Sequence, residues 1–263
     1  MTEQATEAPA LFQTERQREI VALTSQTGRV EVAELAERFG VTTETIRRDL
    51  SDLQRQKVVR RVHGGAIPWE TTGFEPLLSV RADLRDDEKR RLAHAAVAEL
   101  PDTGAIIIDS GSTLTRFAEA IPRSCSLRVV TNSLLTAQVL AGNDSTDVIV
   151  LGGKLRKNTL AMVDAEAAAA VQPLSVDTLF ISSDGLSPER GLSTPYREEA
   201  ALKQAMIRAA ERVVALVDHS KIGQDHFIRF AAWSDVDVLV TNTEADAETV
   251  AVIESLGTTV VLA

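Results

Sequence analysis

Residues 42–48 gather side chains that can read a nucleic acid. Thr43, Glu44 and Thr45 are hydrogen-bonding residues, and Arg47 and Arg48 follow them closely. Glutamate can accept a hydrogen bond from a cytosine amine, threonine can touch the methyl group of thymine, and arginine can bind guanine or phosphate. On a helix, these residues would form the reading face that enters a DNA major groove.

A helix from Thr43 to about Gln56 would position these groups. Ile46, Leu50 and Leu53 recur at spacings of four and three, so they share one apolar face and leave the polar set on the other. Thr42 is a suitable N-cap and is counted among the candidate DNA-contacting residues. The pattern therefore predicts an amphipathic recognition helix.

Two helices precede this one. The sequence predicts a first helix near Thr14–Ser25, with Thr14 as its cap and Gln17 completing a capping box. It predicts a second helix over Val32–Phe39, where apolar residues again have helical spacing. Gly40 then permits the positive φ that a tight turn between helices requires.

A basic hairpin is expected after the third helix. Lys57, Arg60, Arg61 and His63 lie where a hairpin would meet the DNA backbone or minor groove, and Gly64-Gly65 supplies the turn. The succession of helices, turn and basic hairpin predicts a winged helix-turn-helix.

The charge distribution agrees with such a DNA-binding domain, which we call the head. The chain carries a net charge of −10, yet residues 11–68 hold 10 lysines and arginines against 8 acidic residues. Residues 69–263 hold 18 against 28. The basic surface is therefore local, as a small DNA-binding unit needs.

Length and composition limit the other functions. The 263 residues allow two domains, and a content of 44% hydrophobic and 25% charged residues is that of a soluble globular protein. No apolar run approaches the roughly 20 residues needed to cross a bilayer, so no membrane association is expected. A single cysteine, Cys125, and scattered histidines indicate no disulfide, metal or cofactor and fit a reducing cytoplasm.

The C-terminal part alternates apolar runs with helical patterns. A helix over Arg85–Leu100 opens it. The predicted buried strands are Ala105–Ile108, Leu127–Val130, Val148–Leu151, Val176–Ile181, Val213–Val217, Val238–Val240 and Thr259–Leu262. The predicted helices among them are Leu114–Ala120, Leu134–Leu140, Ala165–Val171, Glu198–Ala210 and Ala247–Leu256. This alternation predicts a mostly parallel, doubly wound α/β domain.

Small and polar residues follow several of these strands, at the edge where such sheets bind ligands. They are Asp109, Ser110, Gly111, Ser112 and Thr113; Thr131, Asn132 and Ser133; Gly152, Gly153 and Lys154; and Asp184 and Gly185. Small residues let the backbone approach an anion, and free N–H groups at the start of a helix favour phosphate. The edge therefore predicts a site for a small polyol phosphate.

Residues 13–67 resemble the N-terminal domain of the DeoR family of bacterial transcriptional regulators. The motifs that carry the resemblance are Arg38-Phe39-Gly40-Val41-Thr42, Glu44-Thr45-Ile46-Arg47-Arg48-Asp49-Leu50 and Arg60-Arg61-Val62-His63-Gly64-Gly65-Ala66. Residues 86–242 are similar to the family's sensor domain, which is related to ribose-5-phosphate isomerase and binds phosphorylated sugars. The resemblance implies ligand-binding roles for the polar edge residues above and for Glu198, Lys203 and Lys221.

The resemblance implies a cytoplasmic regulator that binds double-stranded operator DNA and responds to a phosphorylated sugar, most simply as a repressor of a carbohydrate operon. The expected organisation is a disordered arm over 1–12, a winged helix-turn-helix over 13–68 with its motif at about 30–49, a linker over 69–85 and a sensor over 86–263. One head reads too few base pairs to find a genomic site, so a homo-oligomer is expected.

Two residues depart from the pattern. Asp164 stands where the family often has glycine, and Ser187 stands three residues after Asp184, where the related isomerases carry a second carboxylate. Because isomerisation needs a base and charge stabilisation together, this loss favours a sensor with no catalytic residue. A sugar-phosphate isomerase with an appended DNA-binding head is the alternative. A constitutive DNA-binding protein whose second domain only oligomerises is a third possibility.

Overall fold

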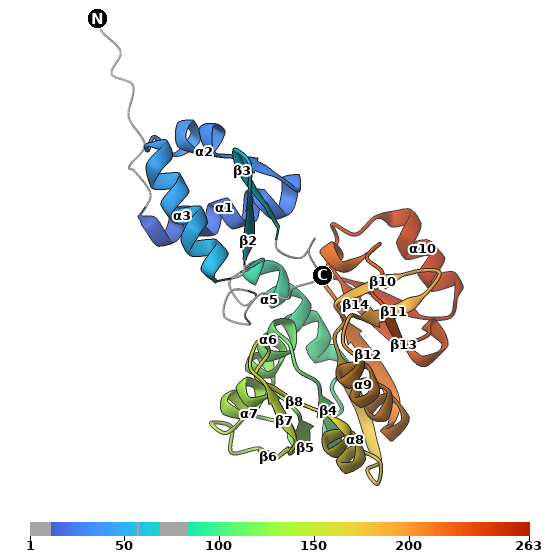
Figure 1. Ribbon diagram of the computed structural model, residues 1–263. Coiled ribbons are helices and arrows are strands. Elements are labelled where there is room, and N and C mark those ends of the chain that lie inside the picture. The colour runs from blue at the N-terminus through green and yellow to red at the C-terminus, as the bar shows by residue number, and fades with distance from the viewer. Residues whose placement is uncertain (1–11, 57, 69–80, 82–83) are drawn as a thin grey trace, which may run out of the picture. The chain divides into compact units, whose positions relative to one another are not determined.

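The chain divides into two compact units, Met1–Leu84 and Arg85–Ala263 (Figure 1). The computed structural model describes residues 12–56, 58–68, 81 and 84–263. The predicted arm over 1–12 and the predicted linker over 69–85 lie largely outside these residues, and Lys57 lies wholly outside them. Among the described residues, no helix is both long and apolar enough to cross a membrane.

The first unit is a winged helix-turn-helix. Its elements are α1 (Gln13–Thr27), β1 (Val30–Glu31), α2 (Val32–Phe39), α3 (Thr43–Arg55), β2 (Val59–Val62) and β3 (Gly65–Pro68). The strands form an antiparallel sheet in the order β1-β3-β2. Ile20 of α1, Leu35 of α2, and Ile46 and Leu50 of α3 are buried in one apolar core. The periodicity of the sequence predicted this packing because each helix buries only one stripe.

The start of α1 differs from the sequence prediction. The helix begins at Gln13, and the Glu15 carboxylate accepts a hydrogen bond from the Phe12 N–H at 3.1 Å. The predicted capping box of Thr14 and Gln17 is therefore wrong. Gln17 has another partner, because its side-chain amide turns toward α3, and Thr14 already lies within the first turn.

The second unit is built on a seven-stranded parallel sheet, ordered β15-β14-β12-β9-β4-β5-β6. The strands are β4 (Thr103–Ile108), β5 (Ser126–Thr131), β6 (Thr146–Val150), β9 (Val176–Ile181), β12 (Ala210–Leu216), β14 (Val238–Thr241) and β15 (Thr259–Leu262). Each neighbouring pair runs parallel. The predicted doubly wound fold is confirmed, and its strand order reverses between β4 and β9, which is where such sheets bind ligands.

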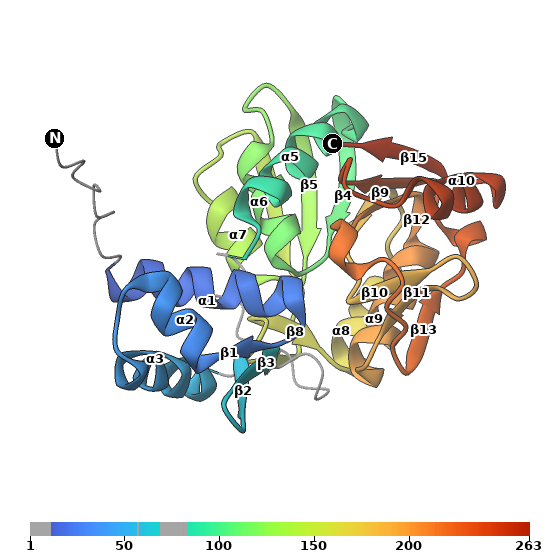
Figure 2. The same ribbon diagram turned by 90° about the horizontal axis from the view of Figure 1, so that it is seen from above.

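Helices cover both faces of this sheet (Figure 2). They are α5 (Asp86–Ala96), α6 (Ser112–Ala120), α7 (Leu134–Leu140), α8 (Ala165–Val171), α9 (Arg197–Ala209) and α10 (Ala247–Ser255). Ile106 and Ile108 of β4 pack with α5, α6 and α7, whereas Ile107 packs with α8, α9 and α10. The alternation follows from the two-residue period of a strand, and it explains why β4 is apolar throughout its buried half.

Short elements outside the main sheet were not predicted. They are the antiparallel pair β7 (Lys154–Arg156) and β8 (Ala161–Val163), the small sheet of β10 (Gly185–Ser187), β11 (Gly191–Thr194) and β13 (Ile228–Ala231), and the 3-10 turns η2 (Val97–Glu99), η3 (His219–Lys221) and η4 (Trp233–Asp235). Both small sheets extend from the carboxyl-end side of the main strands, since β7 follows β6 and β10 follows β9.

Candidate functional site

The N-terminal half of α3 presents a polar face. The Thr42 hydroxyl caps the helix by accepting the Thr45 N–H at 3.2 Å, so the predicted cap forms. Thr43, Arg48 and the ion-paired Glu44 and Arg47 are exposed, whereas Thr45 is half-buried beside the cap. Of the five residues that the sequence placed on the outward face, all but Thr45 are therefore exposed on α3.

The wing is the hairpin of β2 and β3. Its turn occupies His63 and Gly64, and Gly64 has a φ of +78°. The predicted Gly64-Gly65 turn is thus one residue too late, because Gly65 already pairs with Val62 as the first residue of β3. Gly65 matters for a different reason. A Cβ there would stand 1.9 Å from the Val30 carbonyl oxygen, so only glycine lets β1 approach.

The basic residues of the wing differ in their contacts. Arg60 and His63 are exposed, as a surface that meets DNA requires. Arg61 is tied to α3: its guanidinium donates to the Ser51 hydroxyl at 2.8 Å, and its backbone N–H donates to Gln54 at 2.9 Å. Arg61 therefore links the wing to the recognition helix in addition to any contact with a phosphate.

Sequence reasoning missed one cation at this surface. Arg29 follows α1, and its guanidinium donates to the His63 carbonyl oxygen at 3.4 Å, so it lies beside the turn of the wing. Its side chain is 55% exposed and also approaches Glu31 at 3.6 Å. An isolated arginine between a helix and a strand carries no sequence pattern, and only the pairing of β1 with β3 brings it to the wing.

In the second unit, the predicted phosphate loop lies at the switch point of the sheet. Asp109 follows β4, and its N–H bonds to the Phe180 carbonyl of the neighbouring strand β9 at 3.0 Å. Gly111 precedes the first turn of α6 with a φ of +138°, a conformation that other residues rarely adopt. Ser112 and Thr113 open α6. The loop thus places the N-terminus of α6 at the carboxyl-end edge of the sheet, an arrangement that favours the binding of an anion.

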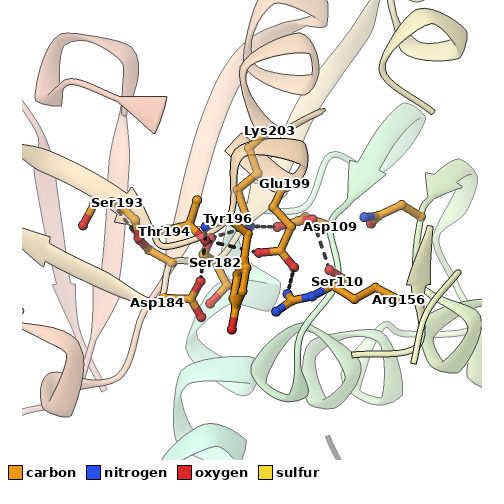
Figure 3. Close-up of polar contacts among 12 residues, drawn as sticks. Asp109, Ser110, Arg156, Ser182, Asp184, Ser193, Thr194, Tyr196, Glu199 and Lys203 are labelled. Carbon is orange, nitrogen blue, oxygen red and sulfur yellow. Dashed lines mark hydrogen bonds and ion pairs between the residues drawn. The ribbon is translucent and has the colours of Figure 1, made fainter. Parts of the chain in front are cut away.

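Asp109 and Lys203 form a buried ion pair across this edge (Figure 3). Their side chains are 1% and 8% exposed, and Lys203 also donates to the Ser182 carbonyl oxygen at 2.8 Å. Burial alone would lower the pKa of Lys203, but the carboxylates of Asp109 and Glu199 outweigh it and raise that pKa above its usual range. Lys203 therefore stays charged and neutralises the carboxylate at the head of the loop.

A second group of polar residues lies beside this pair (Figure 3). The Thr194 hydroxyl stands 2.7 Å from an oxygen of Asp184 and 3.2 Å from one of Glu199, and it can donate its proton to one of them at a time. Glu199 also pairs with Arg156, whose guanidinium stacks 3.5 Å above the Tyr196 ring. The network fixes both carboxylates near the end of β9.

Glu198, the residue before Glu199, is exposed. The family resemblance placed Glu198 at the ligand, but the structure exposes Glu198, where it approaches Lys154 at 3.7 Å, and buries Glu199. Successive helix residues differ by 100°, so only one of the two can face the sheet. The inward period of Glu199, Lys203 and Met206 could have identified the buried one from the sequence.

Thr131, the last residue of β5, is buried, as are Asn132 and Ser133 after it. The Ser133 hydroxyl caps α7, and the Asn132 amide donates to the Met162 carbonyl oxygen of β8 at 3.2 Å. The Oδ1 atom of Asn132 is buried, and no hydrogen-bond partner for it occurs among the described residues. It remains an acceptor that a ligand hydroxyl could satisfy.

Asp164 organises the turn that holds Gly152, Gly153 and Lys154. Its carboxylate accepts the Lys154 N–H at 3.0 Å and the Ala167 N–H at 2.9 Å, and the Ala167 bond foremost lowers the pKa of Asp164. Its φ of +152° is one that glycine favours. The acid thus adopts this backbone conformation at a cost, and it binds the Lys154 N–H of this turn and caps α8 at the Ala167 N–H.

Lys221 lies one strand further along the same edge, in η3 after β12. Burial would raise the pKa of Asp218, but attraction to Lys221 and a hydrogen bond from Ser220 lower it. Lys221 is half-buried. The structure therefore places Lys221 at the ligand edge beside a carboxylate. Among the described residues, no group of three histidine, cysteine or acidic side chains could hold a metal ion.

Comparison with known proteins bears on both units. Residues 16–72 match the DeoR-like helix-turn-helix domain, and residues 85–243 match the DeoR C-terminal sensor domain. The HTH-type transcriptional regulator GlpR of Haloferax volcanii is 35% identical over 94% of this chain and 96% of its own. The glycerol-3-phosphate regulon repressor of Escherichia coli K12 is 30% identical over 88% of this chain and 91% of its own.

A third relative, the HTH-type transcriptional repressor GlcR of Bacillus subtilis, is 29% identical over 88% of this chain and 89% of its own. Among solved structures, ribose 5 phosphate isomerase A of Neisseria gonorrhoeae aligns over 52% of this chain and 54% of its own at 23% identity, with a TM-score of only 0.39. Since both domains match and the relatives align over nearly the whole chain, the protein belongs to the DeoR family and is a DNA-binding transcriptional regulator.

Proposed function

We propose that this regulator is a repressor of a carbohydrate uptake or catabolic operon and that a phosphorylated sugar or polyol releases it from the operator. The names of two relatives, a glycerol-3-phosphate regulon repressor and the repressor GlcR, support the direction of control. A ligand that prefers the released state by about 1–3 kcal/mol would change operator affinity roughly 5–150-fold.

The observation that carries the proposal is the loop at the switch point between β4 and β9. Residues Asp109, Ser110, Gly111, Ser112 and Thr113 offer hydroxyls and backbone N–H groups at the start of α6. A free carboxylate there would repel phosphate, but the buried ammonium of Lys203 neutralises Asp109. We assign the phosphate to this loop. Lys203 then acts through Asp109, and Lys221 and Lys154 are the candidates for further cationic contact.

The sugar hydroxyls would face Asp184 and Asn132. Carboxylate and amide oxygens accept from hydroxyl groups, and the Oδ1 atom of Asn132 is buried without a partner among the described residues. The Thr194 hydroxyl lies between Asp184 and Glu199 and donates its one proton to either carboxylate. We therefore assign to Asp184 the hydroxyl-binding role that the resemblance implied for Glu198.

We propose that the sensor binds its ligand without converting it. Ser187, the last residue of β10, stands where the related isomerases carry a second carboxylate. Its hydroxyl donates to the Asp225 carboxylate at 2.7 Å. The relatives are named as transcriptional regulators. Incubation with ribose 5-phosphate and fructose 6-phosphate, followed by chromatography of the sugars, tests for the alternative isomerase, and multiple turnovers would establish it.

We further propose that the protein works as a cytoplasmic homo-oligomer on repeated half-sites. A single head buries too little DNA to select one genomic site, and heads on one DNA face require half-sites spaced by about 34 Å or multiples of it. Sedimentation of the protein with and without DNA tests this assembly. A monomer under both conditions would contradict it.

The experiment for the effector uses operator DNA selected by the wild-type protein from random duplexes. Phosphorylated sugars and glycerol 3-phosphate are first screened by thermal shift, because a ligand at 100 times its Kd stabilises the fold by about 2.7 kcal/mol. The active compound is then titrated into the operator complex of wild type, Ser112→Glu and Ser112→Ala.

Ser112→Glu should keep operator affinity and resist release, because the new carboxylate fills the loop and repels phosphate. Ser112→Ala, which loses one hydroxyl, should require only a modestly higher ligand concentration, as should Lys221→Ala. Ser255→Glu adds the same charge on the exposed part of α10 and serves as the control. If Ser112→Glu releases DNA at the wild-type ligand concentration, the phosphate binds elsewhere.

A further inference from the structure

A buried ion pair joins α1 to α3 in the DNA-binding unit. The Arg16 guanidinium donates to Oδ2 of Asp49 at 2.6 Å, and the two side chains are only 9% and 2% exposed. Gln17, the next residue of α1, donates to the other oxygen of Asp49 at 3.2 Å. Both oxygens of one carboxylate on α3 are thus bound by consecutive residues of α1.

The same carboxylate lies directly after the exposed arginines of α3. Asp49 follows Arg47 and Arg48 in sequence but is buried on the same side of α3 as the apolar residues Ile46 and Leu50. The angle about the axis of α3 between Asp49 and the exposed polar face is therefore fixed. A rotation of α3 about its axis that moves Asp49 would therefore turn the two arginines by the same angle.

Two further bonds hold α3 along its length. Gln13 of α1 donates to Asp52 at 3.1 Å, one turn beyond Asp49. On the wing side, Arg61 donates to Ser51 and to Gln54. Directional contacts from α1 and from β2 thus reach α3 on different sides.

Apolar packing alone would not set this rotation, because the hydrophobic effect has no preferred direction. A buried ion pair contributes little net stability after desolvation, but its geometry can specify one register among several of similar energy. A roll of about 20° would move a side-chain tip about 6 Å from the helix axis by roughly 2 Å. That displacement exceeds the tolerance of a hydrogen bond to a base edge.

We infer that Arg16 and Gln17 hold Asp49 as a clamp that sets the rotation of the recognition helix, so that base specificity depends on residues that do not touch DNA. The inference rests on α3 being the reading helix. These three are positioning residues, and their loss should lower the preference for the operator over random DNA. The number of phosphate contacts should stay the same.

The test replaces the ion pair in the full-length protein by apolar residues, Arg16→Met with Asp49→Leu. Such replacements often leave stability unchanged or raised, so folding and specificity can be separated. Affinity is measured for the duplex that wild type selects from a random pool and for random duplexes of equal length. We expect the ratio of the two affinities to fall at least tenfold, with an unchanged thermal midpoint and an unchanged dependence on salt concentration.

Two further variants make the result decisive. Arg55→Met removes an exposed arginine of the same helix and should keep the wild-type ratio. Gln17→Met removes one bond to Asp49 at similar volume, and it should lower the ratio at least twofold without unfolding the unit. If the double variant does not fold, Gln17→Met alone decides.

A wild-type affinity ratio in the folded double variant, or in Gln17→Met where the double variant is unfolded, would overturn the clamp. The variant Arg47→Ala with Arg48→Ala is measured in parallel. If it loses operator binding while the clamp variants keep specificity, only the clamp is wrong. If it also keeps operator binding, the assignment of α3 falls as well, whereas effector-dependent release is tested independently of both.

Discussion

Replacing Lys203 with methionine removes the ammonium that faces Asp109 and leaves a charged carboxylate in the interior. The Asp109 and Lys203 side chains are 1% and 8% exposed, and Lys203 is bonded to both Asp109 and the Ser182 carbonyl oxygen. Breaking one side of such a buried pair costs about 3–5 kcal/mol, because the remaining charge keeps its desolvation penalty without compensation. Methionine fills much of the volume of the lysine stem, so the cost is chiefly electrostatic.

This cost converts into a measurable temperature. For a unit of the size of Arg85–Ala263, each 1 kcal/mol lowers the unfolding midpoint by about 2–4 °C. Lys203→Met should therefore lower the midpoint of the sensor by roughly 6–20 °C in a calorimetric scan. Adding Asp109→Asn to Lys203→Met removes the unpaired charge and should recover a large part of the loss.

The pH dependence supplies an independent check. The folded pKa of Lys203 is raised above that of the unfolded chain, so its contribution to stability is fully present below about pH 10.4 and is lost as the pH rises through the folded pKa. Wild type should lose this contribution in strongly alkaline buffer, whereas Lys203→Met has none to lose. A midpoint for Lys203→Met within about 3 °C of wild type at pH 7 would refute the argument that the pair compensates a buried charge.

Three other sets of substitutions probe separate parts of the structure. Arg47→Ala and Arg48→Ala should each weaken operator binding by roughly 1–3 kcal/mol in a titration, with loss of base preference where the arginine reads a base and a reduced salt slope where it binds phosphate. Asp164→Ala should destabilise the sensor more than Asp164→Gly in thermal unfolding, because both lose the bonds to Lys154 and Ala167 but only glycine relieves the φ of +152°; equal losses would remove the backbone argument. Burial foremost raises the folded pKa of Glu88, so its ionisation at pH 7 opposes folding. Glu88→Gln should therefore raise the unfolding midpoint at pH 7 and lose this advantage near pH 4, and a lower midpoint at pH 7 would contradict this reasoning.

Much of the fold was predictable because it depends on periodicity. The face of α3 that holds Ile46 and Leu50 followed from helical spacing, and the strands of the main sheet followed from short apolar runs between helices. The turn that leads from β4 into α6 followed from the small residues that come after Ile108. These signals are local, and a local pattern suffices when a long element buries one regular face.

The remaining features depend on contacts that no local pattern records. The small sheet of β10, β11 and β13 consists of strands of three or four residues, too short for a clear period. The ion pair of Asp109 and Lys203 joins residues 94 positions apart, and that of Arg16 and Asp49 joins two helices. Charged residues are usually solvated, so these pairings could be found only once the elements were packed together.

The pairing of Asp109 with Lys203 also has a consequence for the nascent chain. A ribosome adds about 5–20 residues per second, so roughly 5–20 s separate the synthesis of these two residues. For most of this interval β9, the strand that pairs with β4 at the switch point, is still incomplete, whereas the core of the DNA-binding unit, Ile20 to Ala66, has already been made. Each newly synthesised molecule therefore passes through a stage in which the DNA-binding unit can fold while the sensor unit cannot. A ligand that binds the completed edge of the sheet would stabilise the folded sensor by mass action and so shorten that stage.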